Sequence, residues 1–287
     1  MKSTTHHLSI RDNAKLPAII YGFDRITVWL DHPELPIKIA HLKRHCTNVE
    51  ESLQQMPFNP RWKLKVELYQ PTIEGLELLE SALGYEIAVC VTYVEIACDI
   101  RSTQKGQARK QLKDFLAGAY IPNLRQTAQR DYMTWYFGRR ANENGIQPSV
   151  LVAYADKPSK LNNAQPAEKD LCDLHIEGRR AGTKGLKPQG IISLSDLIQF
   201  NHQKFWDNNL VMYQLPKLAQ LGRLLAADQG RSADVSGTAL RKRAHAWIER
   251  YSNEGAFVLH NALRDYPQLK RHLSKVKFSE WLKMIVQ

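Results

Sequence analysis

Hydrophobic and polar residues alternate with the two-residue period of β-strands in parts of the first hundred residues. Arg25–Asp31 (RITVWLD) and Trp62–Gln70 (WKLKVELYQ) alternate over most of their length, and a proline follows each of them closely. Such strands pack one face on a core and leave the other in water. Glu86–Ile100 (EIAVCVTYVEIACDI) is longer and rich in β-branched residues, so we predict that it is the central strand of a sheet.

Between these strands, apolar residues recur at the three- and four-residue spacing of amphipathic helices. This spacing predicts a short helix over Ile37–Leu53. A second helix is predicted to begin after Thr72, which is a suitable N-cap, and to end at Gly84. A third helix, with a basic face, is predicted over Lys105–Ala119.

The next part of the chain returns to short strands, which we predict around Trp135–Arg139, Ser149–Tyr154 and Leu171–Arg180. Ala181–Gly190 (AGTKGLKPQG) then has the composition of a linker. This order of elements predicts an α+β fold for residues 1–190, with a central, mainly antiparallel sheet flanked by helices.

From Leu194 onward the pattern is helical. Ser195 is placed to cap a helix that runs to Trp206. Further helices are predicted over Leu215–Ala227, Thr238–Glu254 and Tyr266–Val286. We therefore predict a separate helical C-terminal region over residues 191–287.

The positive charge of the chain is concentrated after residue 100. The chain has 287 residues, 43% of them hydrophobic, and a net charge of +11. Residues 1–100 carry 10 Lys+Arg against 13 Asp+Glu, whereas residues 101–287 carry 30 against 16. A net charge of +14 in that part, from 30 minus 16, indicates a polyanionic partner, although a basic surface can also serve only solubility.

Nothing in the sequence predicts a membrane protein or a secreted one. No apolar segment approaches the roughly 20 residues that span a bilayer. The first residues, MKSTTHHLSIRDN, are polar and lack the apolar core of a signal peptide. The cysteines Cys46, Cys90, Cys98 and Cys172 show no ligand spacing, so we expect reduced thiols and a cytoplasmic protein.

The ends of two predicted strands carry the candidate chemistry. The strand Ser149–Tyr154 delivers Tyr154, Asp156 and Lys157. The strand Leu171–Ile176 delivers His175, Glu177, Arg179 and Arg180. A phenol, carboxylates and several cations on adjacent strands suit work on a phosphodiester. The phenol can attack phosphorus, a carboxylate can hold a divalent metal, and the cations can neutralise phosphate oxygens.

Four segments in this part of the chain resemble the replication initiation proteins of rolling-circle plasmids and filamentous phages. They are VEIACDI (Val94–Ile100), YFGRR (Tyr136–Arg140), VAYADKPSK (Val152–Lys160) and HIEGRR (His175–Arg180). The family pattern has an acidic strand, a YyGsR turn, a YdK strand and a RfEiRl strand in this order. Here YADK has one residue more than YdK, Glu95 replaces an aspartate, and His175 replaces an arginine.

The resemblance implies a metal-dependent DNA nickase that starts replication at an origin. In that family a tyrosine attacks a phosphodiester and remains linked to the 5′ phosphate, and the freed 3′-OH primes a host polymerase. By this resemblance Tyr154 and Lys157 are the catalytic residues. Mg²⁺ or Mn²⁺ is expected at the carboxylates Glu95, Asp99 and Glu177. DNA phosphates are expected at Arg139, Arg140, Lys160, Arg179 and Arg180.

Each of these residues also has a purely structural explanation. A carboxylate on a buried strand needs a partner, and a salt bridge to arginine serves Glu95 or Asp99 as well as a metal ion does. A tyrosine at the end of an apolar strand is often a packing residue, so Tyr136 competes with Tyr154 as the nucleophile. His175 lies two residues before Glu177 on the same face of a strand, so both could face the metal, although a lone histidine is more often a surface or core residue.

The sequence leaves other functions open. A DNA-binding protein of the same descent that recognises an origin or operator without cutting it is the alternative to a nickase. An RNA-binding module is a third, because Trp135, Tyr136 and Phe137 could stack on bases. A host helicase and a polymerase are possible partners of an initiator, and the oligomeric state is open, a homodimer included.

Overall fold

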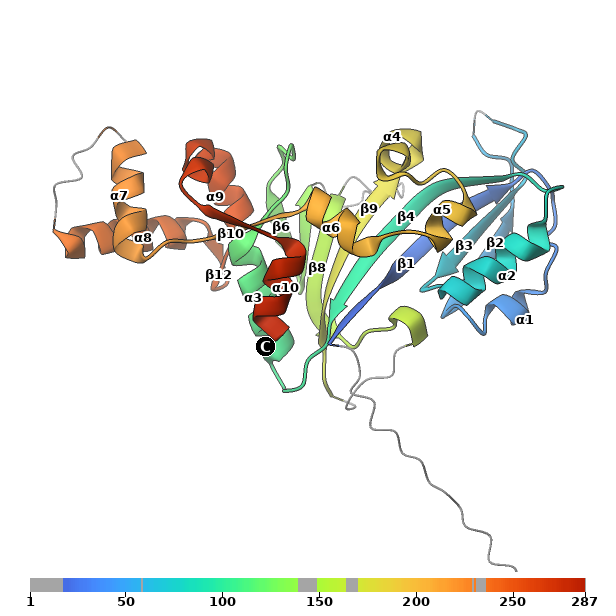
Figure 1. Cartoon of the computed structure of the whole chain (residues 1–287), viewed down its shortest axis with the longest axis horizontal. Helices are drawn as coiled ribbons and strands as arrows, with labels where there is room; N and C mark the ends of the chain where they lie inside the picture. The colour runs from blue at the N-terminus through green and yellow to red at the C-terminus, as the bar shows by residue number, and fades with distance from the viewer. Residues whose placement is uncertain are drawn as a thin grey trace, which may run out of the picture.

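The computed structural model describes residues 18–57, 59–138, 149–163, 170–228, 230 and 236–286. Its main feature is one eight-stranded sheet with the strand order β2-β3-β1-β4-β9-β8-β7-β6 (Figure 1). Neighbouring strands are antiparallel throughout. The strands are β1 (Ile19–Leu30), β2 (Asn48–Leu53), β3 (Leu64–Tyr69), β4 (Val89–Ile100), β6 (Ala128–Asp131), β7 (Thr134–Gly138), β8 (Ser149–Lys157) and β9 (Asp173–Ala181). The prediction of an α+β fold with a central antiparallel sheet is therefore confirmed, and β4 is central in it.

Helices cover one face of this sheet. They include α1 (Ile39–Leu42), α2 (Ile73–Leu83), α3 (Gln107–Gly118), α5 (Leu194–Ile198), α6 (His202–Asn209) and α10 (Phe278–Val286). Figure 1 shows α2, α5 and α6 lying over the strands. Alternate residues of β4, such as Val94, Ile96 and Cys98, belong to the same buried core as Leu76 of α2 and Trp206 of α6. The intervening residues of each strand therefore face away from these helices.

The C-terminal part is mainly helical and contains a second, smaller core. Its other elements are α4 (Gly182–Leu186), η2 (Lys187–Gln189), β10 (Val211–Gln214), α7 (Leu218–Asp228), α8 (Gly237–Arg250), β11 (Ser252–Asn253), β12 (Ala256–Phe257), α9 (Leu259–Asp265), η3 (Pro267–Arg271) and β13 (Ser274–Lys277). Leu221, Leu225, Trp247 and Leu263 are buried together in the second core. The strand order β13-β10-β5 places β5 (Ala119–Tyr120) against this part of the chain.

The predicted division at residue 190 stays a prediction, but packing crosses that position. Phe205 and Trp206 lie 3.0 Å and 3.5 Å from the place of a β-carbon on Gly178, at the middle of β9. Phe278 and Trp281 of α10 stack on each other and are part of the core of the sheet. The C-terminal residues thus complete the helix-covered side of the sheet.

Some predicted elements are different in the structure. Ile37–Leu53 is not one helix, since α1 is a single turn and β2 follows it as an edge strand paired with β3. The helix predicted from Ser195 to Trp206 is two helices, because Ser193 caps α5 with a capping box and Asn201 caps α6. Tyr266–Val286 comprises η3, β13 and α10, and the predicted linker at Ala181–Gly190 holds α4 and η2. Apolar spacing alone did not separate short helices from short strands here.

Other local predictions are confirmed. The Thr72 hydroxyl accepts a hydrogen bond from the Gly75 amide at 3.2 Å, as an N-cap does, and α2 ends before Gly84. The basic helix predicted at Lys105–Ala119 is α3. Within the described residues, every helix is too short or too polar to cross a lipid bilayer.

Candidate active site on the polar face of the sheet

The candidate catalytic and metal-binding residues share the face of the sheet that points away from the helices. On β4 and β9, Glu95 lies opposite Arg179, Ala97 opposite Glu177, and Asp99 opposite His175. On the next strand, Tyr154 of β8 also lies opposite His175. Residues directly opposite each other on paired strands have side chains on the same face. Glu95, Asp99, Glu177 and Tyr154 therefore point to the same side of neighbouring strands.

Asp24 joins this face through an irregularity in β1. The register of β1 against β4 passes from Phe23 opposite Ile96 to Arg25 opposite Glu95, so Asp24 is an extra residue on its strand. Such a bulge redirects a side chain. Ligand-type atoms of Asp24, His175 and Glu177 all lie within 4.8 Å of one another.

The sequence analysis missed Asp24 because it began the strand at Arg25. The available signal was the pair of consecutive charged residues, Asp24 and Arg25, inside a segment that otherwise alternates. In a regular strand one of the two would face the core, where an unpaired charge is costly. A bulge resolves this conflict.

His175 is held by Asp99 on the neighbouring strand. Its Nδ1 lies 2.5 Å from Oδ1 of Asp99, and both side chains are almost fully buried. Burial alone would lower the pKa of His175, but the charge of Asp99 and the hydrogen bond to it raise that pKa well above its ordinary value. Asp99 therefore fixes the ring orientation and favours a proton on Nδ1.

The other ring nitrogen of His175 points toward the carboxylate cluster. Nε2 is buried and has no hydrogen-bond partner among the described residues. It lies 3.5 Å from Oε2 of Glu177, which is longer than a normal N–H···O hydrogen bond. A buried nitrogen of this kind is costly unless something binds it.

The two carboxylates of the cluster have different surroundings. Glu177 is 3% exposed and accepts a hydrogen bond from Nε of Arg179. Burial opposes the ionisation of Glu177, but His175 and Arg179 outweigh it and lower the pKa of Glu177 to about 2. Asp24 is half-buried and accepts a hydrogen bond from the Gln70 amide. Burial raises the pKa of Asp24, and the positive charge of His175 opposes this rise.

Glu95 belongs to a separate network on the same face. Its Oε1 accepts hydrogen bonds from Nη2 of Arg25 at 2.8 Å and from the Tyr93 hydroxyl at 2.6 Å, and it lies 3.6 Å from Nε of Arg179. Burial and the negative charge of Glu177 raise the pKa of Glu95 to about 7. For Glu95 the geometry thus shows the arginine salt bridge that the sequence left open. Of the three predicted metal carboxylates, the cluster contains Glu177.

Tyr154 lies directly over the histidine of the cluster. Its ring stacks on His175 with the ring centroids 4.5 Å apart and the planes 27° from parallel. Nζ of Lys157 lies 5.7 Å from the centroid of the Tyr154 ring. Burial raises the pKa of the Tyr154 phenol strongly, and the charges of Asp24 and Glu177 raise it further. The phenol is therefore neutral unless a cation offsets these carboxylates.

The additional residue in the YADK segment is accommodated by a second bulge. The register of β8 against β9 passes from Tyr154 opposite His175 to Lys157 opposite Asp173, three residues on β8 for two on β9. Because His175 and Asp173 are two positions apart, Lys157 keeps the face that Tyr154 has. The extra residue therefore leaves tyrosine and lysine side by side.

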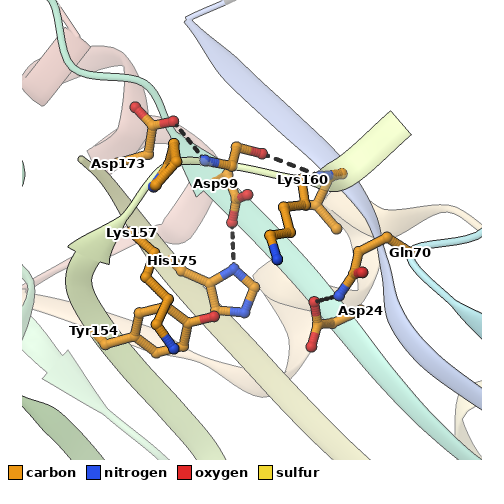
Figure 2. Close-up of a pocket in the computed structure, with 11 residues that line it drawn as sticks. Asp24, Gln70, Asp99, Tyr154, Lys157, Lys160, Asp173 and His175 are labelled. Carbon is orange, nitrogen blue, oxygen red and sulfur yellow. Dashed lines mark hydrogen bonds and ion pairs between the residues drawn. The ribbon is translucent and has the colours of Figure 1, made fainter. Parts of the chain in front are cut away.

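A pocket of about 200 Å³ opens between these residues and the loop that follows β8. Figure 2 shows Tyr154, His175, Asp99 and Asp24 along it, with the side chains of Lys157 and Lys160 directed into it. Buried Asp173 holds the loop in place, because its two oxygens accept hydrogen bonds from the amides of Ser102 and Ser159, each at 2.9 Å. The pocket thus combines a cationic rim with an acidic floor.

The predicted phosphate-binding arginines are not all on this face. Arg179 lies on it, within the network of Glu177 and Glu95. Arg180, the next residue, points to the opposite face, where its guanidinium stacks on Phe205 at 5.0 Å and donates to Asn209 at 2.9 Å. Burial there lowers the pKa of Arg180 to about 10. Arg139 and Arg140 lie outside the described residues.

Two comparisons with known proteins found no match. No protein-family model matches the chain, and no curated protein sequence matches it. The site itself is therefore the basis for assigning a function. It contains a phenol stacked on a histidine, with carboxylates and two exposed lysines beside them.

Proposed function

We propose that the protein is a rolling-circle replication initiator of a phage or plasmid, a divalent-metal-dependent enzyme that nicks and rejoins DNA through Tyr154. The observation that carries the proposal is the position of Tyr154, stacked on His175 beside Asp24 and Glu177 on the polar face of the sheet. A nucleophile, a candidate metal site and cations for phosphate are the parts that the reaction needs, and they come from the segments that resemble this family.

The chemistry assigns a role to each of these side chains. The phenolic oxygen of Tyr154 forms a bond to phosphorus while the bond from phosphorus to the 3′ oxygen breaks. The proton of the phenol passes to a carboxylate, and Asp24 has the strongest charge influence on that phenol. The leaving 3′ oxygen takes a proton from the exposed Lys157 ammonium. The reverse reaction, attack of a 3′-OH on the phosphotyrosine, rejoins the strand.

The proposed reaction also needs a divalent cation. Bound at Asp24, His175 and Glu177, Mg²⁺ or Mn²⁺ would polarise the phosphate and offset the carboxylates that keep the phenol neutral. The donors fit such an ion, since two are carboxylates and the third is the buried, unpartnered nitrogen of His175. Asp99 then acts behind the site, orienting the histidine.

The charge of the chain supports DNA as the substrate. Residues 101–287 carry the excess of positive charge, 30 Lys+Arg against 16 Asp+Glu, and they include Lys157 and Lys160 at the pocket. An initiator works with the host polymerase, and in some systems a helicase, so we propose that it acts in the cytoplasm.

One observation favours the alternative, a protein that binds an origin or operator without cutting it. Burial and the charges of four carboxylates raise the pKa of the Tyr154 phenol and oppose its ionisation, as they would for a packing residue. A single assay distinguishes the two functions. Supercoiled plasmid that carries the protein's own gene and its flanking DNA is incubated with the protein and Mn²⁺ or Mg²⁺. A nickase yields open circles bearing covalently attached protein. A binding protein retards the DNA and leaves it supercoiled, and preferential binding of RNA would contradict both.

A further inference from the structure

The donor set at the centre of the polar face contains a nitrogen. Mg²⁺ prefers oxygen ligands and is held mainly by carboxylates and water, whereas the affinity of nitrogen-containing sites rises along the first-row transition metals from Mn²⁺ onward, so a nitrogen ligand disfavours Mg²⁺. The three candidate donors here are a carboxylate of Asp24, a carboxylate of Glu177 and Nε2 of His175. The nature of the ion therefore depends on whether this nitrogen is a ligand.

We propose that Asp24, Glu177 and Nε2 of His175 form a binding site with one nitrogen and two oxygen ligands that selects a transition-metal cation, represented by Mn²⁺, over Mg²⁺. This inference deepens the proposed function, because it concerns the metal site on which that function rests.

The first support is the orientation of His175. Histidine ligands of metals commonly donate their other ring N–H to a carboxylate, which fixes the tautomer and makes the free nitrogen a better ligand. In this protein Asp99 occupies that place, 2.5 Å from Nδ1. The bond leaves Nε2 as the donor that faces Asp24 and Glu177.

The second support is the burial of the unpartnered nitrogen. His175 is 6% exposed, so bulk water has little access to Nε2, which no side chain in the described part of the chain satisfies. The stacked ring of Tyr154 covers one side of the imidazole and restricts its movement. A ring held by Asp99 and Tyr154 is organised in advance, which lowers the entropy cost of binding an ion.

The spacing of the three donor atoms is close to that of a single metal site. Two ligands at about 2.1–2.2 Å from one ion lie at most about 4.4 Å apart, and the three atoms lie within 4.8 Å of one another. Asp24 is the half-buried member and lies at a bulge. Three protein ligands leave positions open for water and for a phosphate oxygen.

The closest charges also fit a cation. Glu177 and Asp99 flank the histidine, and Arg179 is engaged by Glu177 and Glu95.

The test is direct binding of Mn²⁺ and Mg²⁺ to the full chain, measured by titration calorimetry, with electron spin echo spectroscopy of bound Mn²⁺ as a second readout. Wild type is expected to bind one Mn²⁺ more tightly than Mg²⁺, and the spectrum is expected to show ¹⁴N modulation from an imidazole.

Two variants of one residue provide matched controls. In His175→Asn the amide can still donate to Asp99 but does not reach the cluster, whereas in His175→Gln an amide oxygen can occupy the place of Nε2. We expect His175→Asn to lose about 10- to 100-fold in Mn²⁺ affinity together with the ¹⁴N signal. His175→Gln should retain binding but lose the preference for Mn²⁺, because its ligand is oxygen. Circular dichroism checks that both variants are folded.

Equal affinities of wild type for the two ions, or an unchanged ¹⁴N signal in His175→Asn, would overturn the inference. The outcome is separable from that of the proposed function. A protein that binds Mn²⁺ through His175 but never nicks DNA contradicts the nickase alone, and one that nicks DNA while wild type binds Mn²⁺ and Mg²⁺ equally tightly contradicts the nitrogen ligand alone.

Discussion

Asp99→Asn removes one charge from the centre of the site and keeps its shape. The amide oxygen can still accept a hydrogen bond from Nδ1 of His175, which lies 2.5 Å from the Asp99 carboxylate. Hydrogen bonds to charged groups contribute about 1.5–3 kcal/mol, and neutral ones about 0.5–1.5 kcal/mol. Because Asp99 and His175 are 1% and 6% exposed, solvent screens their interaction little. We expect Asp99→Asn to lower the free energy of unfolding by about 1–2 kcal/mol in metal-free protein at pH 6.

The stabilisation by the Asp99–His175 pair depends on pH in a definite direction. The pKa of His175 is raised in the folded protein through Asp99, so the stabilisation is fully present below the unfolded pKa of about 6.5. The stabilisation is lost as the pH rises through the raised pKa of His175 in the folded protein, because the wild-type histidine then gives up its proton. The difference between wild type and Asp99→Asn should therefore be largest below about pH 6.5 and shrink toward pH 9.

Urea denaturation in the presence of a chelator, at half-unit steps from pH 5.5 to 9, measures this difference. A difference that stays constant across the range would show that His175 does not titrate with Asp99, and the description of the pair would be wrong. Asp99→Asn should also weaken Mn²⁺ binding by about 10- to 100-fold, as loss of the partner behind a metal ligand does.

Further predictions concern the substrate and the smaller core. Lys157→Ala and Lys160→Ala should each reduce the slope of log affinity against log salt for single-stranded DNA by about 0.7, measured by fluorescence anisotropy. Arg180→Gln should leave that slope unchanged, because Arg180 points to the helix-covered face; a reduced slope would contradict this placement. Gly222→Ala should destabilise the chain by about 1–3 kcal/mol, because its β-carbon would overlap the backbone carbonyl of Leu240 where α7 crosses α8. An unchanged melting temperature would refute that close crossing.

Regular periodicity predicted much of the sheet. Length and β-branched residues identified β4 as the central strand. Glu95 and Asp99 lie on one face of it because a period of two leaves no other arrangement within a regular strand. The caps of α2 were equally accessible, since Thr72 and Gly84 act through local backbone chemistry. These features depend on neighbours in the sequence.

Features that depend on pairing between distant strands could not be predicted from the sequence. The bulge at Asp24 exists only against β4, and the sequence therefore did not show that this carboxylate meets His175 and Glu177. The engagement of Glu95 by Arg25 likewise joins residues 70 positions apart. A period of two puts Arg180 on the opposite face of β9 from Arg179, whereas the family resemblance implied that both bind phosphate.

The edge strand β2 was missed for a related reason. Between Ile37 and Leu53, one helical turn and an edge strand each offer too few residues for a period to show. Which one forms is decided by pairing of β2 with β3, a tertiary contact.

Covalent capture of DNA by Tyr154 tests the central claim most directly. Single-stranded oligonucleotides from the DNA that flanks the gene, labelled on the 3′ side of each candidate cut, are incubated with protein and Mn²⁺ and separated after denaturation. Wild type should retain label, and Tyr154→Phe should retain none, although its ring still stacks on His175 and its DNA affinity is unchanged. Mass spectrometry of the labelled peptide should identify a phosphotyrosine at Tyr154. Label that remains on Tyr154→Phe, or a phosphate found on Tyr136, would contradict the account.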